Sequence, residues 1–477
     1  MKRGDVLELR ITDYSLGGKG ICKLPTEQGE LVVFVENSFP GQLVRARISK
    51  KRKRHIECKL LDIIERAPIE QALDYQEISG APYIFVPVAE QESMKKESSL
   101  TVFRKLANVQ DIHERFDRFI SSPKHFNYRN KMEYSFSSIE HDLESNEEKD
   151  HAFALGSKRR GTWWKVESLN KESGMFDQEL ENKLHLIRTF LEKTGLPAWH
   201  PPQKTGFFRH LLVRKSFHQD QLLINLVTSS EGLEQFNVQE FSAFLQELLG
   251  KRLAGFRHTV NDDVADRAKI ENGSSQLVFG ENKLIEQLND LFFEISMESF
   301  FQTNPASASL LYEQALNYVF EDLDLSGKVV MDLFCGTGTI GQLLARRSPE
   351  SEIIGVDIVP EAIQNAQENA RYNKIEKVRF YAADVGKFLF QYPEYAGKIA
   401  CIVLDPPRAG IAPKTLQKII QLGAERIVYI SCNPATQARD TDTLMSAGYD
   451  LKKLSLVDQF PHTSHIESIA QFVRIGD

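Results

Sequence analysis

The stretch of residues 328–341 reads KVVMDLFCGTGTIG. Its first half is a short apolar run of the kind that forms a buried strand. Its second half contains Gly336 and Gly338, which permit a tight turn and let the backbone approach a ligand that a side chain would block. A glycine pair alone is equally typical of a plain tight turn. The stretch therefore predicts a buried strand that ends in a glycine turn.

Similar apolar runs recur along the rest of the chain and alternate with helix-like segments. They are EIIGVDI (352–358), KVRFYAAD (377–384), IACIVLDPP (399–407) and RIVYISC (426–432). Two β-rich runs, YDLKKLSLVDQF (449–460) and SIAQFVRI (468–475), close the chain. Strands alternating with helices predict an α/β fold: a parallel, doubly wound, Rossmann-like sheet with helices on both faces.

Acidic residues follow two of these predicted strands. In such sheets, ligands bind beyond the carboxyl ends of the strands. Asp357 ends the second strand, where an acid can bond both hydroxyls of a ribose, and Asp384 ends the third, within reach of an adenine amino group. The chain has no GxxxxGK[ST] motif. The series thus fits an adenosine-bearing ligand that is not held by a P-loop.

Cys432 lies in YISCNPATQARD (429–440), between a predicted strand and a predicted helix. Asn433 is a good helix N-cap, and Pro434 suits the first helical turn. The exposed N–H groups and the dipole of a helix N-terminus favour a thiolate, so we expect a reactive sulfur. The alternative is a small core cysteine.

The remaining sequence predicts two further domains. Residues 1–66 have short β-rich runs between glycine turns, which indicates a small antiparallel OB-like barrel. Residues 67–290 mix strand runs with amphipathic helices, which predicts an α+β middle domain, and residues 291–477 form the α/β domain. The acidic stretch 139–151 is predicted to be an exposed loop.

Charge is distributed unevenly along the chain. The net charge is −7, but residues 1–66 carry +5 and the rest −12. SKKRKRH (49–55) therefore predicts phosphate contacts on the barrel, although a lone charge run is often only a solvated loop. The residues expected to make these phosphate contacts are Lys51, Arg52, Lys53 and Arg54.

Other bulk features exclude several classes of protein. No apolar stretch approaches ~20 residues and the N-terminus has no signal-peptide pattern, so we expect a soluble, cytoplasmic protein without a membrane partner. The five cysteines are scattered, which argues against a disulfide framework or a cysteine-rich metal site. Cys22, Cys58, Cys335 and Cys401 are expected to be packing residues.

The motifs of the C-terminal half resemble those of the RNA uracil-5-methyltransferase family. They are SFFQTN (299–304), DLFCGTG (332–338), DPPRAG (405–410), SCNPATQARD (431–440) and DQFPHTSHIE (458–467). The N-terminal barrel resembles the TRAM module common in that family. The resemblance implies an enzyme that uses S-adenosylmethionine to methylate C5 of a flipped-out uridine in RNA, and we expect it to be a monomer. We expect 23S ribosomal RNA as the target, with transfer RNA as the alternative.

The resemblance also assigns roles to individual residues. Cys432 would add to C6 of the base, and Glu467 would remove the C5 proton. The cofactor-binding positions would be Gln302, Phe334, Gly336, Gly338, Thr339, Asp357, Asp384 and Asp405. Asp405 is also expected to orient the target base, whereas Arg408 could equally be an ion-pair partner.

The sequence departs from the family pattern at two places. Many relatives hold an iron–sulfur cluster on cysteines where this chain has Ala72, Ile78 and Ala81, so we expect no cluster and no other metal. RNA cytosine-5-methyltransferases use an additional cysteine beside the proline of the fourth strand, and DPPR has none, which favours uracil.

Residues 126–131 allow two interpretations. In FNYRNK (126–131), Arg129 and Lys131, with Phe126 and Tyr128, are possible RNA contacts or simply a strand edge.

Two rival functions are possible alternatives. A non-catalytic RNA-binding assembly factor is disfavoured by the joint presence of Cys432 and Glu467. A protein or small-molecule methyltransferase is disfavoured by the basic barrel.

Overall fold

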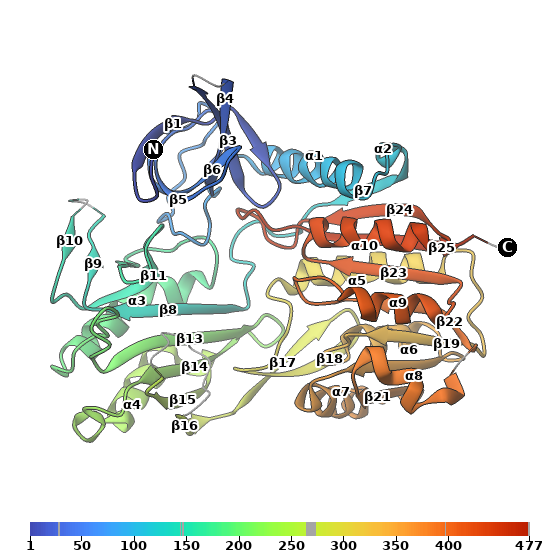
Figure 1. The fold of residues 1–477 in the computed structure, drawn as a ribbon. Helices are drawn as coiled ribbons and strands as arrows, with labels where there is room; N and C mark the ends of the chain where they lie inside the picture. Colours follow the sequence, from blue (N-terminus) through green and yellow to red (C-terminus); the bar gives the residue numbers. More distant parts are fainter. Residues whose placement is uncertain (27–28, 144, 146, 264–272, 396, 476–477) are drawn as a thin grey trace. The chain divides into compact units, whose positions relative to one another are not determined.

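The computed structural model describes residues 1–26, 29–143, 145, 147–263, 273–395 and 397–475 (Figure 1). The chain forms two compact units. Unit 1 comprises Met1–Val88, Lys124–Glu286 and Glu294–Glu298, and unit 2 comprises Ala89–Pro123, Gln287–Phe293 and Ser299–Asp477.

Unit 1 begins with a six-stranded sheet in the order β1-β5-β6-β4-β3-β2. Its strands are β1 (Val6–Arg10), β2 (Asp13–Ser15), β3 (Lys19–Thr26), β4 (Gly29–Glu36), β5 (Leu43–Lys51) and β6 (His55–Glu65). Alternate side chains, such as Val44, Ala46 and Ile48 of β5, are buried in a core enclosed by this sheet, as the period of a strand requires. The β4–β6 pair is parallel, whereas the sequence predicted a wholly antiparallel barrel.

A second sheet of unit 1 has nine strands in the order β10-β9-β12-β11-β8-β13-β14-β15-β16. These are β8 (Lys131–Ser137), β9 (Glu140–His141), β10 (Glu148–Lys149), β11 (Ala154–Lys158), β12 (Val166–Ser168), β13 (Phe208–Ser216), β14 (Gln221–Thr228), β15 (Leu253–Asn261) and β16 (Gly273–Gly280). The helices are α3 (Gln178–Glu192) and α4 (Val238–Leu249). The acidic stretch 139–151 contains the paired strands β9 and β10 instead of being only a loop.

Unit 2 is built on an eight-stranded sheet in the order β21-β20-β19-β22-β23-β25-β24-β7. Its strands are β19 (Val329–Leu333), β20 (Glu352–Asp357), β21 (Val378–Ala382), β22 (Ile399–Leu404), β23 (Arg426–Ser431), β24 (Tyr449–Val457), β25 (Glu467–Arg474) and β7 (Phe116–Ile120). All seven apolar runs of the C-terminal half therefore form strands, and β19–β23 are parallel as predicted. A separate hairpin joins β17 (Lys283–Leu288) to β18 (Leu291–Ser296).

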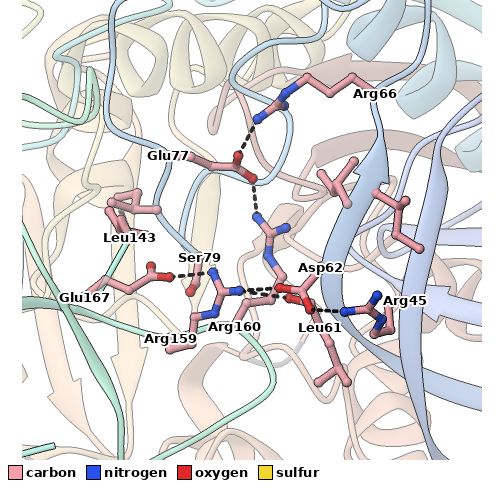
Figure 2. A pocket seen from close by; sticks show the side chains of 13 residues that line it. Arg45, Leu61, Asp62, Arg66, Glu77, Ser79, Leu143, Arg159, Arg160 and Glu167 are labelled. Atoms are coloured by element: carbon pink, nitrogen blue, oxygen red, sulfur yellow. Dashed lines mark hydrogen bonds and ion pairs between the residues drawn. The ribbon is translucent and has the colours of Figure 1, made fainter. Parts of the chain in front are cut away.

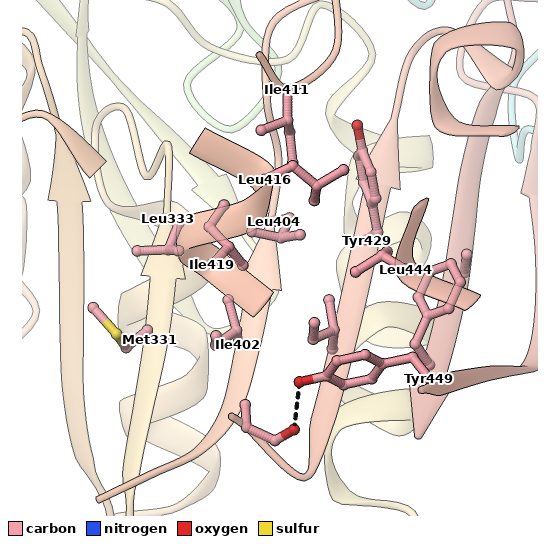
Figure 3. Close-up of a cluster of buried hydrophobic side chains, with 14 of the residues drawn as sticks. Met331, Leu333, Ile402, Leu404, Ile411, Leu416, Ile419, Tyr429, Leu444 and Tyr449 are labelled. Atoms are coloured by element: carbon pink, nitrogen blue, oxygen red, sulfur yellow. Dashed lines mark hydrogen bonds between the residues drawn. The ribbon is translucent and has the colours of Figure 1, made fainter. Parts of the chain in front are cut away.

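Helices cover both faces of this sheet (Figure 1). They are α5 (Pro305–Phe320), α6 (Thr339–Arg347), α7 (Pro360–Tyr372), α8 (Phe388–Gln391), α9 (Pro413–Gln421) and α10 (Pro434–Ser446), preceded in the chain by α1 (Val88–Leu106) and α2 (Ile112–Arg115). Figure 3 shows part of the core, in which Leu333, Leu404 and Tyr429 of neighbouring strands pack together. At its edge the Tyr449 hydroxyl donates a hydrogen bond to the Ala424 carbonyl at 2.8 Å. This core sets the strand ends that carry the site.

Residues 89–123 belong to unit 2, although the sequence placed them in the middle domain. The reason is long-range packing. Strand β7 pairs with β24, and Leu100 and Phe103 of α1 join the core of the α/β sheet. Cys22, Cys58, Cys335 and Cys401 are buried, which confirms them as packing residues.

Within the part of the chain that the structure describes, no helix is both long and apolar enough to span a membrane.

A buried ion pair fastens α1 to the loop between β24 and β25. The Lys95 ammonium lies 2.7 Å from a carboxylate oxygen of Asp458, and their side chains are 2% and 0% exposed. Lys95 also donates to the Phe460 carbonyl at 3.1 Å, and the Gln91 side chain accepts from the His462 N–H at 2.8 Å. Burial lowers the pKa of Lys95, so the charged form depends on Asp458. The pair fixes the path of the loop that leads to Glu467.

Replacing Lys95 by methionine should destabilise the protein by about 3–5 kcal/mol, because it leaves the Asp458 carboxylate buried without a counter-charge. Urea unfolding would measure this change. Lys377→Met, which breaks an exposed pair with Glu350 at 3.4 Å, is the control and should cost at most about 1 kcal/mol. Equal, small losses in both variants would contradict a structural role for the Lys95 pair.

Candidate active site

Cys432 lies directly after β23 and is separated from α10 by the N-cap residue Asn433, as the sequence predicted. The Asn433 side chain caps α10 by accepting a hydrogen bond from the Ala435 N–H at 3.2 Å, and Pro434 occupies the first turn. Cys432 is half-buried, in contrast to the other four cysteines, all of which are buried. Its sulfur is therefore the accessible one.

Glu467 is brought to Cys432 by the register of two strands. Strand β25 runs antiparallel to β23, with Ser431 opposite Ser468. One residue forward from Ser431 and one residue back from Ser468, Cys432 comes beside Glu467, which begins β25 and is 4% exposed. Asp405 follows β22, whose neighbour in the sheet is β23. The thiol and the two carboxyl groups form one electrostatic cluster.

The ionisation of this cluster differs from the sequence-based expectation. Burial, followed by Glu467 and Asp405, raises the pKa of Cys432 to about 11, and Arg408 opposes this only partly. The prediction that the helix N-terminus favours a thiolate is thus wrong for the protein by itself, since desolvation and two carboxyl groups outweigh the helix dipole. Burial also raises the pKa of Asp405 to about 7 and that of Glu467 well above its usual value.

The glycine turn after β19 forms as the sequence predicted. Gly336 has φ +51° and Gly338 has φ +76°, a region that favours glycine. A Cβ on Gly336 would meet nothing within 4 Å, so the space beside it is open, whereas a Cβ on Gly338 would lie 2.5 Å from the Phe380 ring. Asp357 at the end of β20 accepts from the Gly336 N–H at 3.0 Å and from the Val359 N–H at 2.9 Å. Its carboxylate therefore holds the turn in place.

The remaining predicted cofactor positions lie at strand or helix ends of unit 2. Phe334 follows β19 with a left-handed φ of +65°, and Thr339 is the first residue of α6. Asp384 is exposed after β21. Gln302 precedes α5, and its side chain accepts from Gln459 at 3.5 Å. The contacts of these residues with the cofactor remain predictions.

Two buried residues that the sequence analysis did not single out also belong to this region. Asp332 of β19 is fully buried; one oxygen accepts from the Gly341 N–H at 2.8 Å, and the other has no hydrogen-bond partner among the described residues. Burial raises the pKa of Asp332 to about 8. Tyr312 of α5 hydrogen-bonds Gln302 and interacts with Asp405 and Glu467. The signal for Asp332 was a charged residue inside an apolar strand.

The predicted RNA contacts fall into two groups. Arg52, Lys53 and Arg54 are exposed at the turn between β5 and β6, while Lys51 donates to the Met1 carbonyl at 3.1 Å. In β8, Lys131 donates to the Met297 carbonyl at 2.7 Å, and burial lowers its pKa.

Arg129 is only partly exposed, and its Nε atom is buried. Arg52, Lys53 and Arg54 are therefore available to a polyanion, whereas Lys131 is occupied by the Met297 carbonyl.

The positions expected to replace cluster cysteines offer no ligand atoms. Ile78 and Ala81 are buried and Ala72 is exposed, and none of these side chains can bind iron.

Comparisons with known proteins agree with this architecture. The family described as tRNA (uracil-5-)-methyltransferase matches residues 264–474. An uncharacterized RNA methyltransferase of Clostridium acetobutylicum is 32% identical, with 99% of each chain aligned, and one of Clostridium tetani is 32% identical, with 98% of each aligned.

Among solved structures, the Pyrococcus abyssi tRNA (uracil-54, C5)-methyltransferase in complex with S-adenosyl-L-homocysteine has the same fold. The TM-score is 0.69 at 21% identity, over 98% of this chain and 100% of that one. The Clostridium acetobutylicum relative is more than 30% identical over almost its full length, and the uracil-5-methyltransferase family matches residues 264–474. This chain therefore belongs to the RNA uracil-5-methyltransferase family.

Proposed function

We propose that this protein transfers a methyl group from S-adenosylmethionine to C5 of a uridine in RNA, through a covalent bond between Cys432 and C6 of the base. The observation that carries the proposal is the β23–β25 register, which sets an accessible thiol beside a buried carboxyl group at the carboxyl ends of the sheet. Family membership supports the same chemistry.

The glycine turn and its neighbours fit the adenosine end of the cofactor. The open space beside Gly336 and the carboxylates of Asp357 and Asp384 are suited to a ribose and an adenine. When bound, S-adenosylmethionine supplies the methyl group as an electrophile. Gln302 and Phe334 would hold its other end.

Cys432 makes C5 of uracil reactive. C5 is a poor nucleophile until a thiolate adds to C6, which moves electron density onto C5 and O4. With a pKa of about 11, only about one molecule in 10⁴ carries the thiolate at pH 7. The thiol proton must therefore leave as the base arrives, and Asp405, with a pKa of about 7, is a carboxylate of the same cluster that can accept it.

Glu467 completes the reaction. After methylation, C5 carries both the methyl group and its original proton. An ionised Glu467 takes this proton; the C–H electrons form the C5–C6 double bond, and the C–S electrons leave with the sulfur as a thiolate. Burial makes Glu467 a stronger base than an exposed glutamate, because its pKa is raised well above the usual value.

The identity of the target RNA is a separate part of the proposal. We expect 23S ribosomal RNA as the target, as in the sequence analysis. Transfer RNA is the second candidate, because the matching family and the Pyrococcus abyssi neighbour both carry tRNA in their descriptions. The exposed basic turn at Arg52–Arg54 supports either polyanion. The protein would act as a cytoplasmic monomer.

Reaction of the free enzyme with iodoacetamide should report the ionisation of Cys432. The rate should rise about tenfold per pH unit between pH 7 and 10, since the thiolate is the reactive form. Asp405→Asn should speed it roughly two- to tenfold at pH 8–9, because the ionised Asp405 raises the thiol pKa. Mass spectrometry of the Cys432 peptide is the measurement, Glu425→Gln is the control, and an unchanged rate in Asp405→Asn would refute the coupling.

The two catalytic roles should fail at different steps. Cys432→Ala should bind RNA and cofactor but form no covalent adduct. Glu467→Gln should add to the base, transfer the methyl group and then stall, because an amide cannot accept the C5 proton. A denaturing gel with methyl-labelled cofactor would reveal the stalled protein–RNA adduct. Normal turnover by Glu467→Gln, or an adduct from Cys432→Ala, would remove that residue from the mechanism.

A deletion strain would identify the target. Mass spectrometry of its separated ribosomal and transfer RNA should show the loss of one or more 5-methyluridines, restored by the wild-type gene but not by Cys432→Ala. Loss from 23S ribosomal RNA is the expected result, and loss only from transfer RNA would establish the alternative. Unchanged 5-methyluridine in both pools would contradict the proposed function.

A further inference from the structure

The loop between β11 and β12 carries an unusual combination of side chains. Residues 158–165 read KRRGTWWK, with four cations, no carboxylate and two of the three tryptophans of the chain. The methyl-transfer chemistry uses none of them. Both strands belong to the nine-stranded sheet of unit 1.

Internal hydrogen bonds hold this loop in one conformation. The Arg159 N–H donates to the Lys165 carbonyl at 2.8 Å, and the Thr162 hydroxyl donates to the Arg159 carbonyl at 3.0 Å. The Ser137 hydroxyl donates to the Trp164 carbonyl at 2.9 Å, and Gly161 turns the chain with φ +73°. A preformed loop loses little conformational entropy when it binds a partner.

Trp163 offers an exposed aromatic face on this loop. It is 55% exposed, although burying a large apolar side chain is normally favourable. Trp164 supports it edge-to-face, with ring centroids 5.7 Å apart and an interplanar angle of 77°. A rigid, exposed ring beside cations is the arrangement on which proteins stack the bases of single-stranded nucleic acid.

Two arginines of the same loop line a polar cavity of about 380 Å³ (Figure 2). Arg159 and Arg160 face it from the loop, while Arg45 of β5 and Arg66, just after β6, face it from the six-stranded sheet. Its lining also includes the carboxylates Asp62, Glu77 and Glu167. The volume lies within the range of about 300–1,000 Å³ that small-molecule sites occupy.

The ion pairs of the cavity leave some guanidinium donors unused. Arg160 bonds Glu77 at 2.6 Å, but its Nε atom is buried and has no partner among the described residues, and its side chain is only 10% exposed. Arg45 is 45% exposed, and its two carboxylate partners are distant: Glu8 lies at 3.5 Å and Asp62 at 3.8 Å. A phosphate would give these donors the charge-assisted hydrogen bonds that the carboxylates do not.

We propose that the loop 158–165 and the adjoining arginine cavity bind a nucleotide of single-stranded RNA, with its base on Trp163 and its phosphate at Arg45 and Arg160. The inference rests on the proposed function and deepens it, because it names a contact for RNA outside the target uridine. An RNA whose uridine is flipped into an active site has unpaired neighbours, and those neighbours can stack.

Fluorescence anisotropy of a labelled single-stranded oligouridylate of about twelve nucleotides tests the site without cofactor or methyl transfer. Trp163→Ala should raise the Kd about 5- to 100-fold with the salt dependence unchanged, because stacking is lost but no phosphate contact. Trp163→Phe should recover most of the affinity. Arg45→Gln should raise the Kd and reduce the slope of log Kd against log salt by about 1.

Two variants of unit 2 serve as matched controls. Tyr372→Ala removes an aromatic ring that is 53% exposed, and Arg346→Gln breaks an exposed pair with Asp290, so neither should change the Kd. Wild-type affinity in both Trp163→Ala and Arg45→Gln would overturn the inference, even if the enzyme methylates its RNA normally. Conversely, Trp163-dependent binding by a wild-type protein that forms no 5-methyluridine would support this site and refute only the proposed function.

Discussion

The antiparallel pairing of β23 with β25 is the constraint on which the site depends. Residues 432 and 467 come from distant parts of the chain, and only the register that sets Ser431 opposite Ser468 makes them neighbours. A slip of one residue would turn Glu467 to the opposite face of the sheet. The pairing is protected on both sides, since β22 adjoins β23 and β24 adjoins β25. The backbone hydrogen bonds between these central strands therefore determine that the Cys432 thiol lies beside the Glu467 carboxyl group.

Burial at this site favours neutral groups over charged ones. The pKa of Cys432 is raised to about 11, and those of Asp405, Asp332 and Glu467 are also raised, in each case chiefly by desolvation. Neutral acids are cheaper to bury than carboxylates, so the fold tolerates several of them at the end of one sheet. The thiol is therefore mostly protonated in the protein alone. In the proposed mechanism, its activation accompanies the arrival of the base.

Much of this arrangement could be predicted from local sequence. Runs such as 426–432 are long, apolar and bounded by turn residues, so strand positions and the cap at Asn433 followed directly from their composition. The predictions that were wrong concern properties that depend on the tertiary structure. The pKa of Cys432 is raised by burial and then by the carboxyl groups of Glu467 and Asp405, and the position of β7 is set by pairing with β24. Asp332 stands inside an apolar run, which was the signal in the sequence, but its burial and its hydrogen bond from the Gly341 N–H depend on the tertiary structure.

The placement of α1 and β7 in unit 2 has a consequence for biosynthesis. The chain crosses between the two units five times, so neither unit corresponds to a continuous segment that could fold alone as it leaves the ribosome. Arg115, just before β7, bonds Asp450 of β24, 335 residues later. At about 5–20 residues per second, this early segment waits roughly 20–70 s for its partner, with apolar side chains such as Phe103 uncovered. The interval makes the nascent chain a substrate for chaperones, and a fragment that begins at residue 291 would leave the edge of β24 open to aggregation.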